Sequence, residues 1–237
     1  YRSQLPDGRK VGLPGLLAWL LKTTPVGRIR LSSIEPPDVT DELLSTMAAS
    51  NGRIAPFLHI CLQSGCDATL RRMARTYDTA FFRAAVERAH QLLPQASLGT
   101  DLIVGFPGET DEEFEQSLSF CREMGFSRMH VFRYSKRPGT PAATADDQVD
   151  PHVMAERSAR ARELARDLRA REASRLVGMD DLVCVQAPFR GVSGGLFDVT
   201  LDAEAPVDAV IPVSVTGVSP DGTTLLGHVC LHGEHAL

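Results

Sequence analysis

The sequence predicts an α/β protein with a parallel sheet, followed by a small all-β domain. Two observations lead to this class. In the first part of the chain, four short apolar runs alternate with helix-like patterns, an order typical of parallel strands joined by right-handed crossovers. After Gly178 the pattern changes to short β-type runs broken by glycine and proline. That texture is typical of a small barrel.

Helical periodicity and capping residues delimit the elements of the first part. The first helix ends before Thr24-Pro25, since a residue that precedes proline disfavours helix, and Asp38 or Thr40 is placed to cap the second. The residues expected to face inward are Leu43, Leu44, Met47, Ala48, Phe82, Val86 and Leu93. Helices are predicted at 13–22, 38–49, 68–73, 79–93 and 111–124, and strands at 29–34, 57–62, 102–104 and 128–134.

The rest of the chain organises around the stretch Thr100–Thr110, Thr-Asp-Leu-Ile-Val-Gly-Phe-Pro-Gly-Glu-Thr. Its apolar run suits a strand buried on both faces, and its two glycines let the backbone bend and approach a ligand. Thr110 is the expected N-cap of the acidic helix that follows. A strand-to-helix turn with two glycines is common, so this stretch alone does not identify a site.

The long segment 151–177 is predicted to be one helix, with seven arginines, four acids and a sparse apolar face of Leu164, Leu168 and Leu176. We interpret it as a solvated helix that links two domains, in preference to a dedicated RNA-binding helix. The predicted domains are therefore 1–147, a linking helix at 148–178, and a small β-barrel at 179–237. Its β-type runs are 182–185, 196–201, 209–218 and 224–229.

Composition and charge narrow the class further. A chain of 237 residues with 43% hydrophobic residues has ample material for a core. No apolar run approaches the roughly 18 residues of a membrane span, and the first residues are not a signal peptide, so we expect a cytoplasmic protein. The net charge of -5 is uneven: residues 1–178 hold 24 Lys and Arg against 22 acids (+2), and residues 179–237 hold one arginine against eight acids (-7).

Five cysteines argue against both a disulfide framework and a zinc ribbon, because their number is odd and they form no Cys-x-x-Cys pair. We expect reduced thiols and no metal site. Cys61 and Cys66 flank the turn Gln63-Ser64-Gly65, where small residues filling space are favoured over metal ligands.

Polar or glycine-rich segments follow each of the four predicted strands. In parallel sheets and barrels the functional site lies at the C-terminal strand ends, so the sequence places a site where these segments meet. They are Arg28–Pro37 (Arg-Ile-Arg-Leu-Ser-Ser-Ile-Glu-Pro-Pro), Phe57–Asp67 (Phe-Leu-His-Ile-Cys-Leu-Gln-Ser-Gly-Cys-Asp), Thr100–Thr110, and Phe132–Pro141 (Phe-Arg-Tyr-Ser-Lys-Arg-Pro-Gly-Thr-Pro).

These four segments, in this order, resemble the later barrel strands of the radical S-adenosylmethionine (radical SAM) methylthiotransferases, with the branch that modifies threonylcarbamoyladenosine in tRNA as the nearest likeness. The resemblance implies a partial (β/α) radical-SAM barrel followed by a TRAM-like barrel. It also implies transfer of a methylthio group to an adenosine beside the anticodon, with S-adenosylmethionine and [4Fe-4S] clusters as cofactors and the tRNA anticodon loop as partner. The alternatives are a sibling enzyme acting on isopentenyladenosine or a ribosomal-protein aspartate, a non-catalytic fragment that binds tRNA or cofactor, and another (β/α) enzyme that needs no iron.

In that family a Cys-x3-Cys-x2-Cys loop holds the cluster, and this spacing is absent from the chain. The resemblance therefore implies a C-terminal part of an enzyme, inactive alone, with no catalytic residue and no metal ligand of its own. The same resemblance implies the residues that contact the cofactor. For His59 a core histidine is an equal alternative, and for Phe132 simple packing is favoured. The cofactor set is Ser32, Ser33, Glu35, His59, Gln63, Ser64, Asp101, Gly105, Gly108 and Phe132.

The segment Tyr134-Ser-Lys-Arg-Pro-Gly-Thr140 combines an aromatic ring, two cations and a turn, a combination suited to a phosphate and a stacked base. It resembles the family's Ser-x-Arg-x-Gly-Thr run, which implies that Tyr134, Lys136, Arg137 and Thr140 contact the tRNA. A merely exposed loop is the alternative. The acidic barrel lacks the cations that a phosphate surface needs, so packing or docking is an open alternative to RNA binding there.

Overall fold

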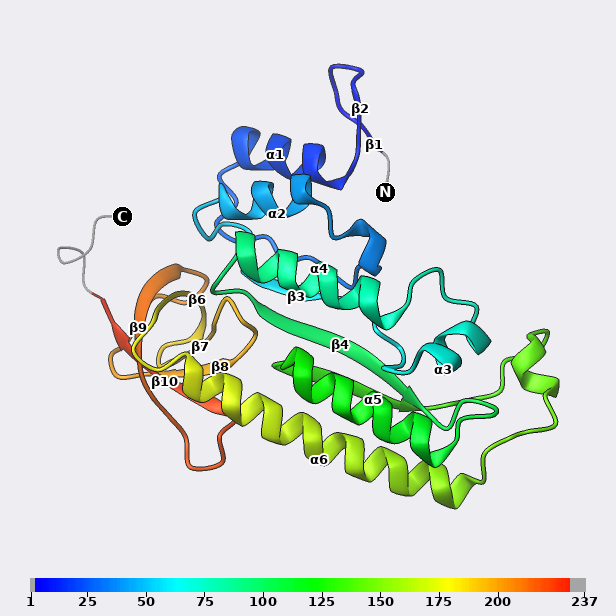
Figure 1. Cartoon of the computed structure of the whole chain (residues 1–237). Helices are drawn as coiled ribbons and strands as arrows, with labels where there is room; N and C mark the ends of the chain where they lie inside the picture. Colours follow the sequence, from blue (N-terminus) through cyan, green and yellow to red (C-terminus); the bar gives the residue numbers. More distant parts are fainter. Residues whose placement is uncertain (1–2, 231–237) are drawn as a thin grey trace.

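The computed structural model describes residues 3–230, which form an open parallel sheet flanked by helices and a small closed barrel (Figure 1). The long helix α6 runs from the far end of the sheet to the barrel. The helices are α1 (Leu13–Thr23), α2 (Asp41–Ala48), α3 (Asp67–Arg72), α4 (Thr79–Leu92), α5 (Asp111–Met124) and α6 (Pro151–Arg175), with the 3-10 helices η1 (Pro36–Asp38) and η2 (Pro141–Thr144). The strands are β1 (Ser3–Gln4), β2 (Lys10–Val11), β3 (Phe57–His59), β4 (Ser97–Val104), β5 (Arg128–Arg133), β6 (Asp180–Ala187), β7 (Arg190–Val192), β8 (Asp198–Leu201), β9 (Val210–Val218) and β10 (Thr224–Val229).

The sheet contains β3, β4 and β5, all parallel and in that spatial order. The sequence prediction of a fourth strand at 29–34 is wrong, because that segment joins β3 and its flanks only through the isolated bridges Ile29–Ile54 and Ile34–Ile60. The two bridged residues are five positions apart on one segment and six positions apart on the other, so the register slips by one residue between them. A slip of this kind interrupts a hydrogen-bond ladder, and Pro56 removes a donor from the same stretch.

Local capping explains where the helices begin and end. The α5 bounds agree with the prediction because Thr110 and Glu113 form a capping box, and Gly125 ends the helix at φ 69°. Thr40, not Asp38, caps α2 by accepting a hydrogen bond from the Leu43 amide.

Helices α4, α5 and α6 enclose the first core, in which Phe82, Phe114 and Phe126 are fully buried. The predicted inward faces are confirmed with one exception: Ala48 is exposed, because it lies at the last residue of α2. The apolar face of α6 is also confirmed. Leu164 and Leu168 belong to this core, whereas Ala173 and Leu176 belong to the core of the small barrel. One segment of chain therefore takes part in both cores.

The small barrel is closed, in the order β10-β8-β7-β6-β9. The sequence prediction missed β7, which has three residues, and the β1–β2 hairpin, whose strands have two residues each. Strands this short leave no recognisable pattern in the sequence. The barrel lies against the N-terminal ends of the sheet strands, where Arg30 Nη2 donates to the Ser193 carbonyl at 2.9 Å. A Cβ at Gly194 would lie 2.8 Å from Pro56 Cδ, so glycine is needed for this close approach. The barrel thus lies at the end of the sheet opposite the C-terminal strand ends.

Within residues 3–230, no helix has both the length and the apolar character needed to cross a membrane.

Candidate functional site at the C-terminal strand ends

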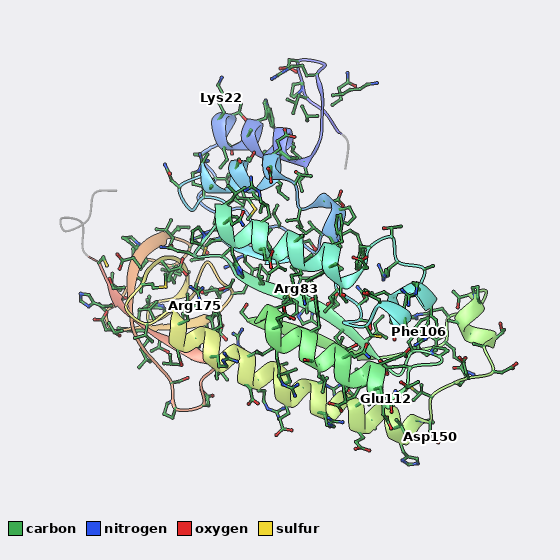
Figure 2. All side chains as sticks on the ribbon, viewed as in Figure 1. Lys22, Arg83, Phe106, Glu112, Asp150 and Arg175 are labelled. Atoms are coloured by element: carbon green, nitrogen blue, oxygen red, sulfur yellow. The ribbon has the colours of Figure 1, made fainter. Side chains whose placement is uncertain are left out.

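The four polar segments meet at one end of the sheet through backbone hydrogen bonds. The Ile34 amide donates to the His59 carbonyl at 2.9 Å, the Ile103 amide to the Gln63 carbonyl at 2.9 Å, and the Tyr134 amide to the Val104 carbonyl at 2.9 Å. Figure 2 shows Phe106, in the loop after β4, at the end of the sheet away from Arg175, which is beside the small barrel. The predicted convergence of these segments is therefore present.

A groove of about 660 Å³ runs beside the first of these segments, between it and helices α1 and α2. The predicted cofactor residues Ser32, Ser33 and Glu35 line it. Arg75 places Nη1 3.3 Å from Glu35 Oε1, so one anionic and one cationic group stand together beside the groove.

Gln63 and Ser64 lie in the turn after β3, and the structure gives them different surroundings. Gln63 has φ 66°, a conformation that non-glycine residues rarely adopt and that often marks a functional turn. Ser64 is fully buried, with its hydroxyl 3.1 Å from Ser117 Oγ and accepting from the Cys66 amide at 3.2 Å. The Ser64 hydroxyl therefore holds the turn against α5.

The loop after β4 is fixed by an ion pair from α6. Glu109 is buried, and its Oε2 accepts from the Gly105 amide at 2.6 Å and from Arg157 Nη1 at 2.8 Å. Arg157 also reaches Asp111 at 2.7 Å and is 5% exposed. Burial raises the pKa of the Glu109 carboxyl, and the Arg157 guanidinium and the Gly105 amide oppose that rise. The view of α6 as a solvated helix is thus wrong at Arg157.

The two glycines of this loop serve packing as well as backbone conformation. Gly105 and Gly108 both have φ 74°, a region that favours glycine. A Cβ at Gly105 would overlap the Met154 side chain of α6, and a Cβ at Gly108 would overlap the Asp147 carboxylate. The Gly108 amide donates to the Asp147 carbonyl at 2.9 Å, so the stretch that precedes α6 helps to hold the loop.

The face of the sheet opposite to the core residues Leu102 and Val104, called the inner face below, carries a cluster of His59, Asp101 and His130. Their donor atoms lie within 4.8 Å of one another. His130 Nδ1 lies 3.2 Å from Asp101 Oδ1, and His59 Nε2 lies 3.1 Å from the same oxygen. The His59 contact is out of line, which leaves Nε2 buried with no hydrogen-bond partner. Burial lowers the pKa of His59, although Asp101 opposes this shift.

The predicted substrate segment extends beyond β5. Phe132 is 51% exposed, and its ring lies edge-on to that of His130 at 6.3 Å between ring centroids. The Tyr134 ring packs edge-on against Phe106 at 5.2 Å between ring centroids. Lys136 and Arg137 are exposed, and Thr140 closes a turn by donating its hydroxyl to the Arg137 carbonyl at 2.8 Å. The two cations are thus open to a partner beside the strand ends.

Sequence reasoning missed three residues of this region: Arg75, His130 and Arg157. The partner of Arg157 lies 48 residues away in the sequence, and no local pattern indicates such a pair. A signal for His130 was present, because strand alternation places it on the same face as Phe132.

The comparisons with known proteins identify the class of fold and the family. Residues 15–121 match the family model "Radical SAM superfamily". The fold resembles coproporphyrinogen III oxidase of Escherichia coli, described as a radical SAM enzyme, with a TM-score of 0.51 and 21% identity over 70% of this chain and 38% of that one. The sheet is open and parallel, with its polar loops at the C-terminal strand ends. Together with the match to the family model, this fold defines a protein of the radical SAM class.

Sequence relatives specify the group. The chain is 40% identical to the threonylcarbamoyladenosine tRNA methylthiotransferase of Thermotoga maritima, over 71% of this chain and 39% of that protein. It is 48% identical to the Bacillus subtilis enzyme of the same name, over 56% and 29%. It is 44% identical to a tRNA-2-methylthio-N(6)-dimethylallyladenosine synthase of Parafrankia, over 65% and 32%. The chain belongs to the radical SAM methylthiotransferase family, and it spans about two fifths or less of the length of these relatives.

The residues present fit one of the family's two cofactors. The paired charges of Glu35 and Arg75 beside the groove, and the unpartnered His59 Nε2, suit a polar zwitterionic ligand such as S-adenosylmethionine. An iron-sulfur cluster needs several thiolates that converge. Among residues 3–230, the one group of three or more close His, Cys, Asp or Glu donors is His59, Asp101 and His130, which contains no thiol. This part of the chain does not fit the cluster.

Proposed function

We propose that this chain forms the S-adenosylmethionine-binding wall and part of the tRNA-binding surface of a tRNA methylthiotransferase. The observation that carries the proposal is the convergence of the four polar segments at one end of the sheet, in a chain of this family. The proposed product is the methylthio derivative of threonylcarbamoyladenosine beside the anticodon. When bound, S-adenosylmethionine supplies the radical and the methyl chemistry of the family.

The chain's own residues bind and orient this ligand. Its amino acid end carries one ammonium and one carboxylate, and Glu35 and Arg75 offer the matching charges. Ser32 and Ser33 provide hydroxyl groups along the same groove. We place the nucleoside end toward Gln63, Asp101 and the loop of Gly105 and Gly108, with Phe132 available for stacking.

The ion pair of Glu109 and Arg157 holds the loop against α6, so the loop is set before the ligand arrives. A preset wall limits the access of water to the reacting atoms, and water exclusion suppresses side reactions of a radical. The contribution of this chain is therefore to bind, to orient and to shield.

The charge match at the groove predicts the first binding result. Arg75→Ala and Glu35→Gln should each weaken S-adenosylmethionine binding to this chain by about tenfold, because each removes a hydrogen bond to a charged group. Glu87→Gln, which changes an exposed carboxylate of α4, is the matched control and should bind as the wild type does. Isothermal titration measures the affinities. Equal affinity of all four proteins would remove the groove from the cofactor site.

The segment after β5 predicts how RNA binding responds to salt. In the complete enzyme, Lys136→Ala/Arg137→Ala should flatten the plot of log affinity for tRNA against log salt by about 0.7 to 0.9 for each phosphate interaction that the substitutions remove. The control Arg162→Ala/Arg166→Ala removes two exposed arginines of α6 and should leave the slope unchanged. The reverse result would make α6 the RNA-binding face.

The function itself is tested by the nucleosides that the complete enzyme makes. Relatives acting on threonylcarbamoyladenosine and on dimethylallyladenosine align at similar identities, so the assay must offer both. The full gene is expressed in bacteria that lack their own methylthiotransferases, and tRNA nucleosides are analysed by mass spectrometry. We expect the methylthio group on threonylcarbamoyladenosine. A product on dimethylallyladenosine alone would reassign the substrate, and no methylthio product would reject the function.

A further inference from the structure

We infer that His130, oriented by Arg128, is a positioning residue that fixes the Asp101 carboxylate at the inner face of the sheet. The inference deepens the proposed function and rests on it for the identity of the ligand, S-adenosylmethionine. The hydrogen-bond chain from Arg128 to Asp101 is a property of these residues alone, so it can be tested without a ligand.

The register of the sheet brings the members of this chain together. Asp101 on β4 pairs with His130 on β5, and Gly99 pairs with both His59 and Arg128. Since residues paired in this way in a parallel sheet point to the same face, all of these side chains lie on the inner face. A Cβ at Gly99 would lie 2.6 Å from Phe57 Cζ and 3.0 Å from His59 Nδ1, so glycine leaves room for both rings.

The donor from Arg128 decides the tautomer of the His130 ring. Arg128 Nε lies 3.2 Å from His130 Nε2, and an arginine N–H can only donate. His130 Nε2 must therefore accept, which places the single proton of the neutral imidazole on Nδ1. This Nδ1–H faces Asp101 Oδ1 at 3.2 Å and donates to it. The Asp101 carboxylate thus accepts a hydrogen bond of defined direction from His130 on β5.

The same contact argues against a metal ion in this cluster. Two imidazoles and one carboxylate are common ligands of divalent transition metals. A metal bound at His130 Nδ1, however, would move the imidazole proton to Nε2, where it would face the Arg128 N–H donor. The arrangement therefore favours the hydrogen-bond chain, and metal binding becomes an outcome of the test.

His59 has a different place in the cluster. Its side chain is 8% exposed, its Nε2 has no hydrogen-bond partner, and that nitrogen lies beside the oxygen that His130 fixes. A buried polar atom without a partner is rare in native proteins. The fixed carboxylate and this nitrogen together form a polar pair on the inner face, where the nucleoside end of the ligand is proposed to lie.

Two substitutions at His130 separate positioning from mere space filling. His130→Leu removes the donor, whereas His130→Asn keeps an amide N–H close to the place of Nδ1. The leucine variant should bind S-adenosylmethionine about tenfold more weakly than the wild type, and the asparagine variant should recover most of that affinity. His152→Leu, at an exposed histidine of α6, is the control and should bind normally. Wild-type affinity in the leucine variant, or equally weakened binding in both variants, overturns the inference.

Nitrogen NMR of the histidine rings tests the chain without any ligand. We expect the Nδ1–H tautomer at His130 in the wild type and a loss of that preference in Arg128→Ala. An Nε2–H tautomer in the wild type overturns the inference. One equivalent of zinc should leave the His59 and His130 signals in place; if both shift, and His130→Leu abolishes the shift at His59, the cluster is a metal site. If the wild type binds no S-adenosylmethionine, the proposed function fails while this measurement still decides the inference.

Discussion

Replacing Arg157 by methionine is expected to destabilise the chain by about 3 to 5 kcal/mol at neutral pH, because it leaves a buried carboxylate without its partner. Arg157 and Glu109 are 5% exposed each, so little solvent is available to replace the missing charge. Since the carboxylate is protonated at low pH, the difference from the wild type should shrink as pH falls through the raised pKa of Glu109. Urea unfolding near pH 5 and near pH 7.5 measures both effects.

Two further proteins make this test specific. Arg157→Met/Glu109→Gln removes both charges and should recover a large part of the stability. Arg88→Met breaks an equally close arginine–carboxylate pair with Asp41 at the surface, where solvent screens the interaction, and it should change stability little. A destabilisation in Arg88→Met as large as that in Arg157→Met would show that burial is not the cause.

Alanine at Gly105 is expected to cost about 2 to 4 kcal/mol of stability and to abolish S-adenosylmethionine binding. The change combines backbone strain at a positive φ with overpacking against Met154. The two contributions can be told apart with Gly125→Ala, since Gly125 has φ 69° and nothing within 4 Å of a Cβ. That control should show the strain alone, about 1 kcal/mol.

A second-site change completes the experiment on the loop. Met154→Ala should partly restore Gly105→Ala by making room for the new methyl group, although it removes apolar packing of its own. Thermal unfolding and isothermal titration of the single and double variants give the coupling. Simple addition of the two destabilisations would place the overpacking somewhere other than Met154.

The parts of the fold that the sequence predicted are those with local causes. The capping box of Thr110 and Glu113 and the C-terminal Gly125 are all readable within α5, and its bounds were predicted correctly. The segment 29–34 has strand-like residues, but its pairing depends on a register slip in a distant partner. A local pattern contains no information about that partner, so the strand was predicted where only two bridges exist.

The candidate site divides in the same way. The strand-end segments were predicted because parallel strands end together, and the structure brings them together. The roles of individual side chains depend on contacts between distant residues. Ser64 looked available in the sequence, yet it bonds to Ser117 of α5, while Arg157 looked solvated and is buried against Glu109. Neither the hydroxyl of Ser64 nor the charge of Arg157 indicates in the sequence whether the side chain is free for a ligand or bonded to another part of the chain.

The placement of the small barrel gives the molecule a charge dipole. The described part of the barrel segment, residues 179–230, holds one arginine and seven acids, whereas the loop after β5, which contains Lys136 and Arg137, lies at the opposite end of the sheet. In the field of a polyanion such a dipole turns, so that the cationic end leads during approach and the acidic end trails. Encounters with the proposed RNA partner should therefore be oriented before contact. Salt, which screens this field over about 10 Å at 0.1 M, should lower the association rate before it affects any bond in the bound complex.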